Sequence, residues 1–189
     1  MPHWEAEGAT YFVTFRLGDS LPAPVLESFR FERNDILLRA KQQGRELTVA
    51  EQKRLDELFS ERIEAYLDSG CGACALAKPE IADMVAGALQ FFNDERYRQF
   101  AWTVMPNHVH TVFRSLPNWL LENILHSWKS FTSKEANKIL GRSGNFWEPE
   151  YFDHLIRNEE EFHRCIEYVV SNPARAGLKD WKWVWMRPM

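Results

Sequence analysis

Two histidines, His108 and His110, stand two residues apart in a run that is typical of a β-strand. Because side chains on a strand alternate between its faces, both imidazoles are expected to point the same way. A convergent pair of neutral imidazoles suits a divalent metal ion and leaves coordination positions open for a phosphate oxygen. By itself the pair is weak evidence, since most strands with this spacing use their histidines in ordinary packing.

A tyrosine and an amide follow on a predicted helix over residues 159–172. Tyr168 and Asn172 are one turn apart on the flank of its apolar stripe. Tyr168 is a candidate nucleophile, although a phenol with an ordinary pKa of about 10 needs a nearby cation to react at neutral pH. Asn172 is a candidate third ligand, and two imidazoles with one amide oxygen favour Mg²⁺ or Mn²⁺ over a closed zinc site. Together these residues suggest a nuclease, while each alone is typical of a packed helix.

The elements that would position these residues follow a simple order. Strands are predicted at 10–17, 99–105 and 108–114, and helices at 22–43, 48–68, 78–93, 117–140 and 159–172. The last helix is capped by Asn158 and is expected to end before Pro173. This order favours an α+β fold, a ferredoxin-like antiparallel sheet with helices on one side, in one domain of residues 1–189. The charged helices at about 22–68 are interpreted as an inserted, solvated hairpin.

Composition bounds the class of protein. The chain has 189 residues, a formal net charge of −4 and 45% hydrophobic residues. Residues 99–147 nevertheless hold five basic and two acidic residues, so a basic face on an acidic body is expected. No apolar run approaches the roughly 20 residues that span a bilayer, and the N-terminus lacks signal-peptide features, so we predict a cytoplasmic protein with no membrane partner. Cys71 and Cys74 are interpreted as reduced thiols rather than a zinc site.

Residues 105–110 resemble the HUH motif of single-tyrosine transposases, in which U is a bulky apolar residue, here Val109. More closely, the chain is similar to the REP-associated tyrosine transposases. The supporting stretches are residues 11–16, 146–154, 156–158 and 167–178. The likeness covers the N-terminal strand and nearly everything from Pro79 onward.

The resemblance implies a metal-dependent enzyme that cleaves and rejoins single-stranded DNA at hairpin-forming repeats. Tyr168 then matches the nucleophile, which forms a 5′-phosphotyrosine and releases a 3′-OH. His108, His110 and Asn172 match the metal ligands. Tyr151 is a competing nucleophile, but Leu155 stands four positions later, where a ligand-type residue is expected. The resemblance also implies a bacterial, nucleoid-associated protein, and the sequence is compatible with a homodimer.

Two other functions stay open at this point. One is a domesticated relative that binds DNA or RNA hairpins without cutting them. The other is an unrelated metallohydrolase that combines the histidine pair with a carboxylate such as Asp153. The candidate nucleic-acid contacts are basic residues for phosphates and aromatic residues for unpaired bases: Arg114, Lys129, Lys134 and Arg157, with Trp147 and Tyr151.

Overall fold

The computed structural model describes residues 8–51, 54 and 63–188. The chain divides into two compact units, residues 1–18 with 74–189 and residues 19–73, which are described separately. The first unit is built on a five-stranded sheet in the order β4-β1-β3-β2-β5, with all neighbouring strands antiparallel. Its strands are β1 (Thr10–Arg16), β2 (Tyr97–Val104), β3 (His108–Ser115), β4 (Phe152–Ile156) and β5 (Val184–Met186).

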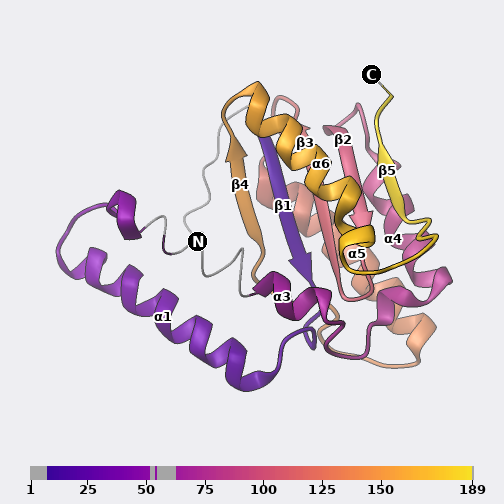
Figure 1. Ribbon diagram of the computed structural model, residues 1–189, viewed down its shortest axis with the longest axis horizontal. Helices are drawn as coiled ribbons and strands as arrows, with labels where there is room; N and C mark the ends of the chain where they lie inside the picture. Colours follow the sequence, from indigo (N-terminus) through magenta and orange to yellow (C-terminus); the bar gives the residue numbers. More distant parts are fainter. Residues whose placement is uncertain (1–7, 52–53, 55–62, 189) are drawn as a thin grey trace. The chain divides into compact units, whose positions relative to one another are not determined.

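The helices of this unit complete a ferredoxin-like core. After η2 (Ala75–Ala77), helix α4 (Pro79–Phe91) connects to the β2–β3 hairpin, and α5 (Leu121–Leu140) leads from β3 to β4. The resulting β-α-β-β-α-β order with spatial strand order 4-1-3-2 confirms the predicted fold. Helices α4 and α5 lie on one face of the sheet, as expected. Helix α6 (Glu159–Arg175) differs from the prediction of helices on one side: it follows the core and covers the opposite face, in front of the sheet in Figure 1.

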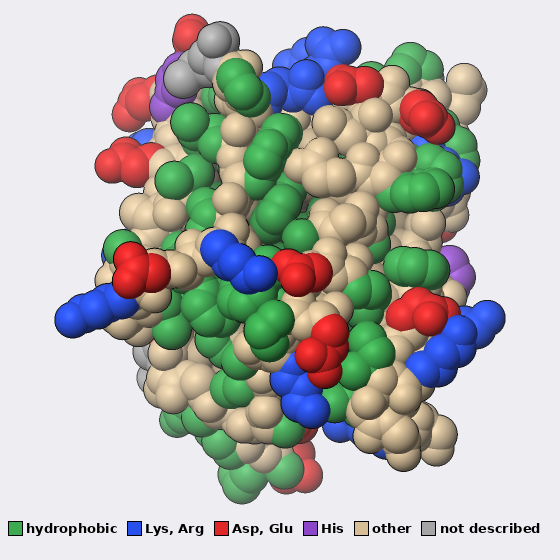
Figure 2. All heavy atoms as spheres, turned by 90° about the vertical axis from the view of Figure 1, so that its right-hand side faces the viewer, with side chains coloured by type: hydrophobic (Ala, Val, Ile, Leu, Met, Phe, Trp, Pro, Cys, Tyr) green, Lys and Arg blue, Asp and Glu red, His purple; other side chains and the backbone are tan. Residues whose placement is uncertain are grey.

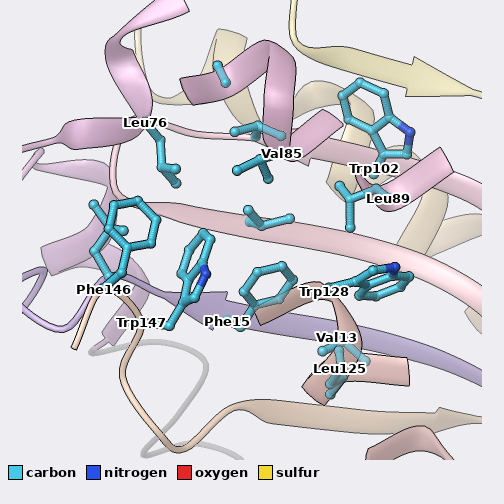
Figure 3. Close-up of a cluster of buried hydrophobic side chains, with 14 of the residues drawn as sticks. Val13, Phe15, Leu76, Val85, Leu89, Trp102, Leu125, Trp128, Phe146 and Trp147 are labelled. Atoms are coloured by element: carbon cyan, nitrogen blue, oxygen red, sulfur yellow. The ribbon is translucent and has the colours of Figure 1, made fainter. Parts of the chain in front are cut away.

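Alternation along β1 explains how the sheet carries two cores. Tyr11, Val13 and Phe15 belong to the large cluster that packs against α4 and α5. Phe12 points the other way, into the smaller cluster beneath α6. Figure 3 shows the large cluster, where the Phe15 ring centroid lies 4.8 Å from that of Trp147. The face of β1 toward α4 and α5 is therefore apolar, whereas on its α6 face Phe12 stands between the polar residues Thr10, Thr14 and Arg16.

Several boundaries differ from those predicted. Helix α6 continues through Pro173 to Arg175. A proline inside a helix removes only one backbone donor. Its carbonyl can still accept a hydrogen bond, and the Pro173 carbonyl accepts one from the Leu178 N–H. Helix α5 begins at Leu121 rather than at Pro117. Strands β4 and β5 were not predicted; both are short edge strands whose pairing with β1 and β2 comes from distant parts of the chain.

The second unit contains α1 (Ala23–Gln42) and α3 (Ile63–Asp68), with a small core of Leu21, Phe29, Ile63 and Leu67. The predicted capping box is confirmed: the Thr48 N–H donates to a Glu51 carboxylate oxygen, and the Glu51 N–H donates to the Thr48 hydroxyl. Residues 52–53 and 55–62 of the predicted 48–68 helix lie outside the described residues, and the single domain of 1–189 stays a prediction. None of the helices described is both long and apolar enough to cross a membrane.

Candidate active site

The two histidines open β3 on the face that α6 covers. Their side chains are almost completely buried, with 1% of His108 and none of His110 exposed. The two Nε2 atoms lie 2.9 Å apart. Two nitrogens bound at right angles to one metal ion, each about 2.1 Å from it, would be separated by about 3.0 Å. The predicted convergence of the two side chains on one face is confirmed. Their separation fits a hydrogen bond between the rings as well as two ligands of a single ion, so the metal-binding role stays a prediction.

Each imidazole is oriented through its other nitrogen. His108 Nδ1 is 2.7 Å from the Asn107 side-chain oxygen, and His110 Nδ1 is 2.7 Å from the Thr14 hydroxyl. Thr14 lies directly opposite His110 in the β1–β3 register. When the Thr14 hydroxyl accepts a hydrogen bond from Nδ1–H of His110, the Nε2 lone pair is available; when the hydroxyl donates to Nδ1, Nε2 carries the proton instead. Thr14 and Asn107 therefore control which nitrogen can bind a metal ion.

Burial keeps both imidazoles neutral. Desolvation lowers the pKa of His108 to about 3. The pKa of His110 is also well below its ordinary value, chiefly through burial and then through the neighbouring His108 and the charge of Arg175. Neutral imidazoles at physiological pH are the form that binds metal ions.

Tyr168 stands over this pair. Its ring lies edge-on to His110, with ring centroids 5.2 Å apart. Phe12 contacts both residues: it stacks on His110 at 5.7 Å and meets Tyr168 edge-on at 5.6 Å. The tyrosine is half-buried, so its ring is held by the sheet while it keeps access to solvent. The structure thus brings together Tyr168 and the histidine pair, which are about 60 residues apart in the sequence.

Asn172 is a second unusual residue of α6. It is fully buried, and neither its amide nitrogen nor its amide oxygen has a hydrogen-bond partner among the described residues. Helix α6 runs along the sheet from Phe162, which meets Phe100 at 4.9 Å, to Tyr168 over His110. One more turn in this direction carries Asn172 toward the end of β3 where His108 lies. A buried amide without partners is costly unless it binds a ligand, so this residue fits the predicted third metal ligand.

The described residues contain no cluster of three or more His, Cys, Asp or Glu side chains that could hold a metal ion. An ion at the histidine pair would therefore take its further ligands from Asn172, from substrate oxygens and from water. Asp153 cannot serve, because it pairs with Val13 and so points to the opposite face of the sheet. The hypothesis of a metallohydrolase that uses Asp153 with the histidines is wrong for this reason.

Sequence reasoning did not single out Arg175, which the fold brings to this site. The carbon at the centre of its guanidinium group is 5.0 Å from the centre of the Tyr168 ring. Arg16 was also missed: it lies opposite His108 in the β1–β3 register and forms a buried ion pair with Glu148 at 3.8 Å. The spacing of Tyr168 and Arg175, two helical turns, is a signal that could have found the first of them once α6 was known to extend through Pro173.

The predicted DNA contacts do not form one surface. Arg114 is exposed at the far end of β3, on the same face as the histidines, and Arg157 is exposed just before α6. Lys134 is exposed on α5, on the other side of the sheet. On the face that Figure 2 shows, acidic and basic side chains are interspersed, and the expected basic surface is not on this side.

The other three predicted contacts lie on α5 or in the segment that follows it. Trp147 is 5% exposed, and its indole N–H donates to the Thr132 hydroxyl, so it is a core residue rather than a platform for a base. Lys129 donates to the backbone oxygens of Glu148 and Pro149, both at 2.7 Å, and burial lowers its pKa to about 8. Lys129 and Tyr151 line an open pocket of about 540 Å³ together with Glu122, Asn123, Leu125, His126 and Pro149. This pocket lies on the α5 side, away from the histidine pair.

Comparison with known proteins adds an independent observation. Residues 79–172 match the family model for IS200-like transposases, and this segment contains the histidine pair, Tyr168 and Asn172. A curated REP-associated tyrosine transposase of Escherichia coli (strain K12) is 27% identical over 92 residues; the match spans 47% of this chain and only 53% of that protein. A solved structure of a REP-associated tyrosine transposase bound to a REP hairpin aligns over 97% of this chain and 80% of its own, with a TM-score of 0.50 and 16% identity. At that identity the structural likeness shows a shared fold.

Proposed function

The chain belongs through residues 79–172 to the IS200-like transposases, and on that premise we propose that it cuts and rejoins single-stranded DNA at hairpin-forming repeats. The observation that carries the proposal is the contact between Tyr168 and His110 at a pair of neutral imidazoles. A nucleophile and a site for a cation lie side by side there. Attack on a phosphodiester requires both of them in one place.

In the proposed reaction the Tyr168 hydroxyl attacks phosphorus and gives up its proton to the surrounding water. The bond between phosphorus and the 3′ oxygen breaks, and the leaving oxygen takes up a proton to become a 3′-OH. The 5′ phosphate remains on Tyr168 as a phosphotyrosine. Attack by a second 3′-OH reverses these bond changes and rejoins the DNA. The covalent intermediate divides one difficult substitution into two easier steps.

His108, His110 and Asn172 would hold the metal ion, and the oxygen ligands that complete its shell favour Mg²⁺ or Mn²⁺. Bound there, the ion neutralises charge on the phosphoryl oxygens. The chain's own residues keep the imidazoles neutral through burial and orient them through Thr14 and Asn107. The unpartnered Asn172 amide supports this ligand set.

Hairpin DNA is the proposed substrate for two reasons. The REP-associated tyrosine transposase in the solved structure has a REP hairpin bound, and its fold is shared over almost all of this chain. In addition, Arg114 and Arg157 are exposed on or beside the sheet face that carries the histidine pair. Cations along this face would track a phosphate backbone toward Tyr168.

A denaturing gel tests the proposal with labelled single-stranded hairpin DNA in Mn²⁺ or in EDTA. We expect a slowly migrating protein–DNA adduct with the wild type and with Tyr151→Phe, and none with Tyr168→Phe. Replacing both His108 and His110 with Ala should abolish the metal-stimulated cut. Adduct that persists in Tyr168→Phe and disappears in Tyr151→Phe would transfer the role to the competing tyrosine. Cutting without any adduct would overturn the phosphotyrosine intermediate.

The burial of the site favours one alternative, a hairpin-binding protein that does not cut. His110 and Asn172 are both completely inaccessible, so a phosphate can reach them only if α6 moves. This alternative predicts that the hairpin is shifted on a native gel but is neither shortened nor captured in Mn²⁺. The same two gels therefore separate the enzyme from the binder.

A further inference from the structure

We propose that Arg175 is a catalytic residue that contacts the phosphate under attack by Tyr168, an inference that rests on the proposed function. The guanidinium carbon lies 5.0 Å from the centre of the Tyr168 ring. The two residues are seven positions apart on α6, so two helical turns bring them to the same side of the helix. The cation is therefore next to the nucleophile in the folded protein, before any substrate binds.

The charge of Arg175 also acts on His110. It is one of the causes, after burial and His108, of the lowered pKa of His110. Arg175 itself is exposed, whereas both histidines are buried. Among the groups gathered here it can meet an incoming phosphate without prior movement of α6.

Within the part of the chain that the structure describes, Arg175 has no carboxylate partner. Other arginines of this unit do: Arg164 on the same helix is 3.5 Å from Glu160, and Arg16 is paired with Glu148. An uncompensated cation beside a nucleophile attracts an anionic substrate, and the planar guanidinium matches two oxygens of one phosphate.

The proposed chemistry requires such a group. As Tyr168 attacks, negative charge builds up on the non-bridging oxygens of the phosphate. Guanidinium N–H donors aimed at these oxygens stabilise the transition state more than the ground state. A purely structural role is the alternative, because a cation in the last turn of α6 also complements the helix dipole.

Single-turnover rates of adduct formation test the role. Arg175→Gln is expected to lower the rate by about 100-fold, the usual loss for one donor to a developing oxyanion. Arg175→Lys keeps the charge but not the fork of donors, and we expect a loss of about 10-fold. Arg164→Gln is the matched control on the same helix, and its rate should stay within about 2-fold of wild type because it is paired on the surface. An unchanged rate in Arg175→Gln would overturn the proposal.

A neutral substrate separates a phosphate contact from a structural role. The cleavage position is first mapped with wild-type protein, and a methylphosphonate is then placed there. If Arg175 neutralises that phosphate, wild type and Arg175→Gln should react at similar rates with the methylphosphonate. Equal losses on both substrates would assign Arg175 to the helix dipole alone and overturn the contact.

DNA binding in EDTA distinguishes this inference from the proposed function. In a Tyr168→Phe background, Arg175→Gln should weaken hairpin binding and lower the slope of log affinity against log salt by about one phosphate contact. A smaller slope without adduct from the wild type would leave the contact standing and overturn the cutting reaction. If the wild type forms the adduct but Arg175→Gln changes neither the slope nor the rate, the cutting reaction stands and the Arg175 contact is overturned. Absence of both binding and adduct would overturn both.

Discussion

The Tyr168 ring meets the His110 imidazole edge-on, at an interplanar angle of 79°. Phe12, from a third element, touches both rings and lies parallel to the imidazole within 19°. The nucleophile is thus positioned by aromatic contacts from β1 and β3 as well as by its own helix. Several consequences can be measured.

Replacing Phe12 with Leu removes the ring that contacts both His110 and Tyr168. We expect adduct formation to slow by about 10-fold, because small displacements of a nucleophile are costly in rate. The free energy of unfolding should fall by only about 1 kcal/mol, since the volume is largely kept. Phe15→Leu, on the other face of β1, is the control: it should cost similar stability but leave the rate per folded molecule unchanged. Equal rate losses in both variants would contradict a local role for Phe12.

Acidification should destabilise the metal-free protein through its histidine pair. An unfolded histidine takes up a proton as the pH falls through about 6.5, whereas the folded state keeps the pKa of His108 near 3 and that of His110 well below its ordinary value. The unfolded state therefore binds more protons below about pH 6.5, and the free energy of unfolding falls as the pH drops from there toward 3.

Urea unfolding in EDTA at pH 7.5 and pH 5 measures this effect. Each buried histidine contributes about 1.4 kcal/mol per pH unit within the window. The variant with Gln at both positions, 108 and 110, lacks these groups and should show a smaller difference between the two pH values. The same difference in both proteins would place the pH dependence on other groups.

Asn172→Leu should act in opposite directions on the metal-free and metal-bound protein. Without metal, the substitution removes a buried amide that has no partner, and we expect a gain of about 1 kcal/mol in unfolding free energy. With saturating Mn²⁺ the wild type should gain stability by about 2.7 kcal/mol at a hundredfold excess over the dissociation constant, and the variant should gain less. Thermal unfolding with and without Mn²⁺ measures both the stability of the metal-free protein and the stabilisation by the metal ion. A variant that is less stable without metal would show that Asn172 has a hydrogen-bonded structural role instead.

The buried Arg16–Glu148 pair should make Glu148→Ala strongly destabilising. Their side chains are only 9% and 5% exposed, so removal of the carboxylate takes this counter-charge away from a buried guanidinium. We expect a loss of about 3 kcal/mol, measured by chemical unfolding at neutral pH. The double variant Arg16→Met with Glu148→Leu removes both charges together and should recover most of the loss. A double variant as unstable as the single one would contradict the charge explanation.

Local patterns predicted the parts of the site that depend on one element. Alternation on a strand was enough to place His108 and His110 on one face, and helical spacing was enough to place Asn172 one turn beyond Tyr168. The helix caps at Asn158 and Thr48 could also be predicted from the sequence, because a cap involves residues only three positions apart. The order of strands and helices was also sufficient for the ferredoxin-like fold.

Predictions that depend on distant pairing were less successful. Trp147 looked available for stacking on a base, but the Leu17–Trp147 bridge and the bond to Thr132 place it in the core. Asp153 was a predicted metal ligand, but its pairing with Val13 places it on the sheet face opposite the histidines. Strand β4 has too few residues to show a clear period, so only its partner β1 defines it.

What the sequence by itself determined is which side chains share a strand face or a helix face, since backbone geometry repeats every two or 3.6 residues. It placed the two histidines on one strand face and placed Tyr168 with Asn172 on one helix face, as two separate local groups. Only the tertiary structure decided that α6 crosses the sheet face that carries the histidines, which sets Tyr168 and Arg175 beside them. Val169 of α6 packs in one cluster with Phe12 of β1 and thereby makes that choice, because burial of apolar area depends on which surfaces meet and not on their order in the chain.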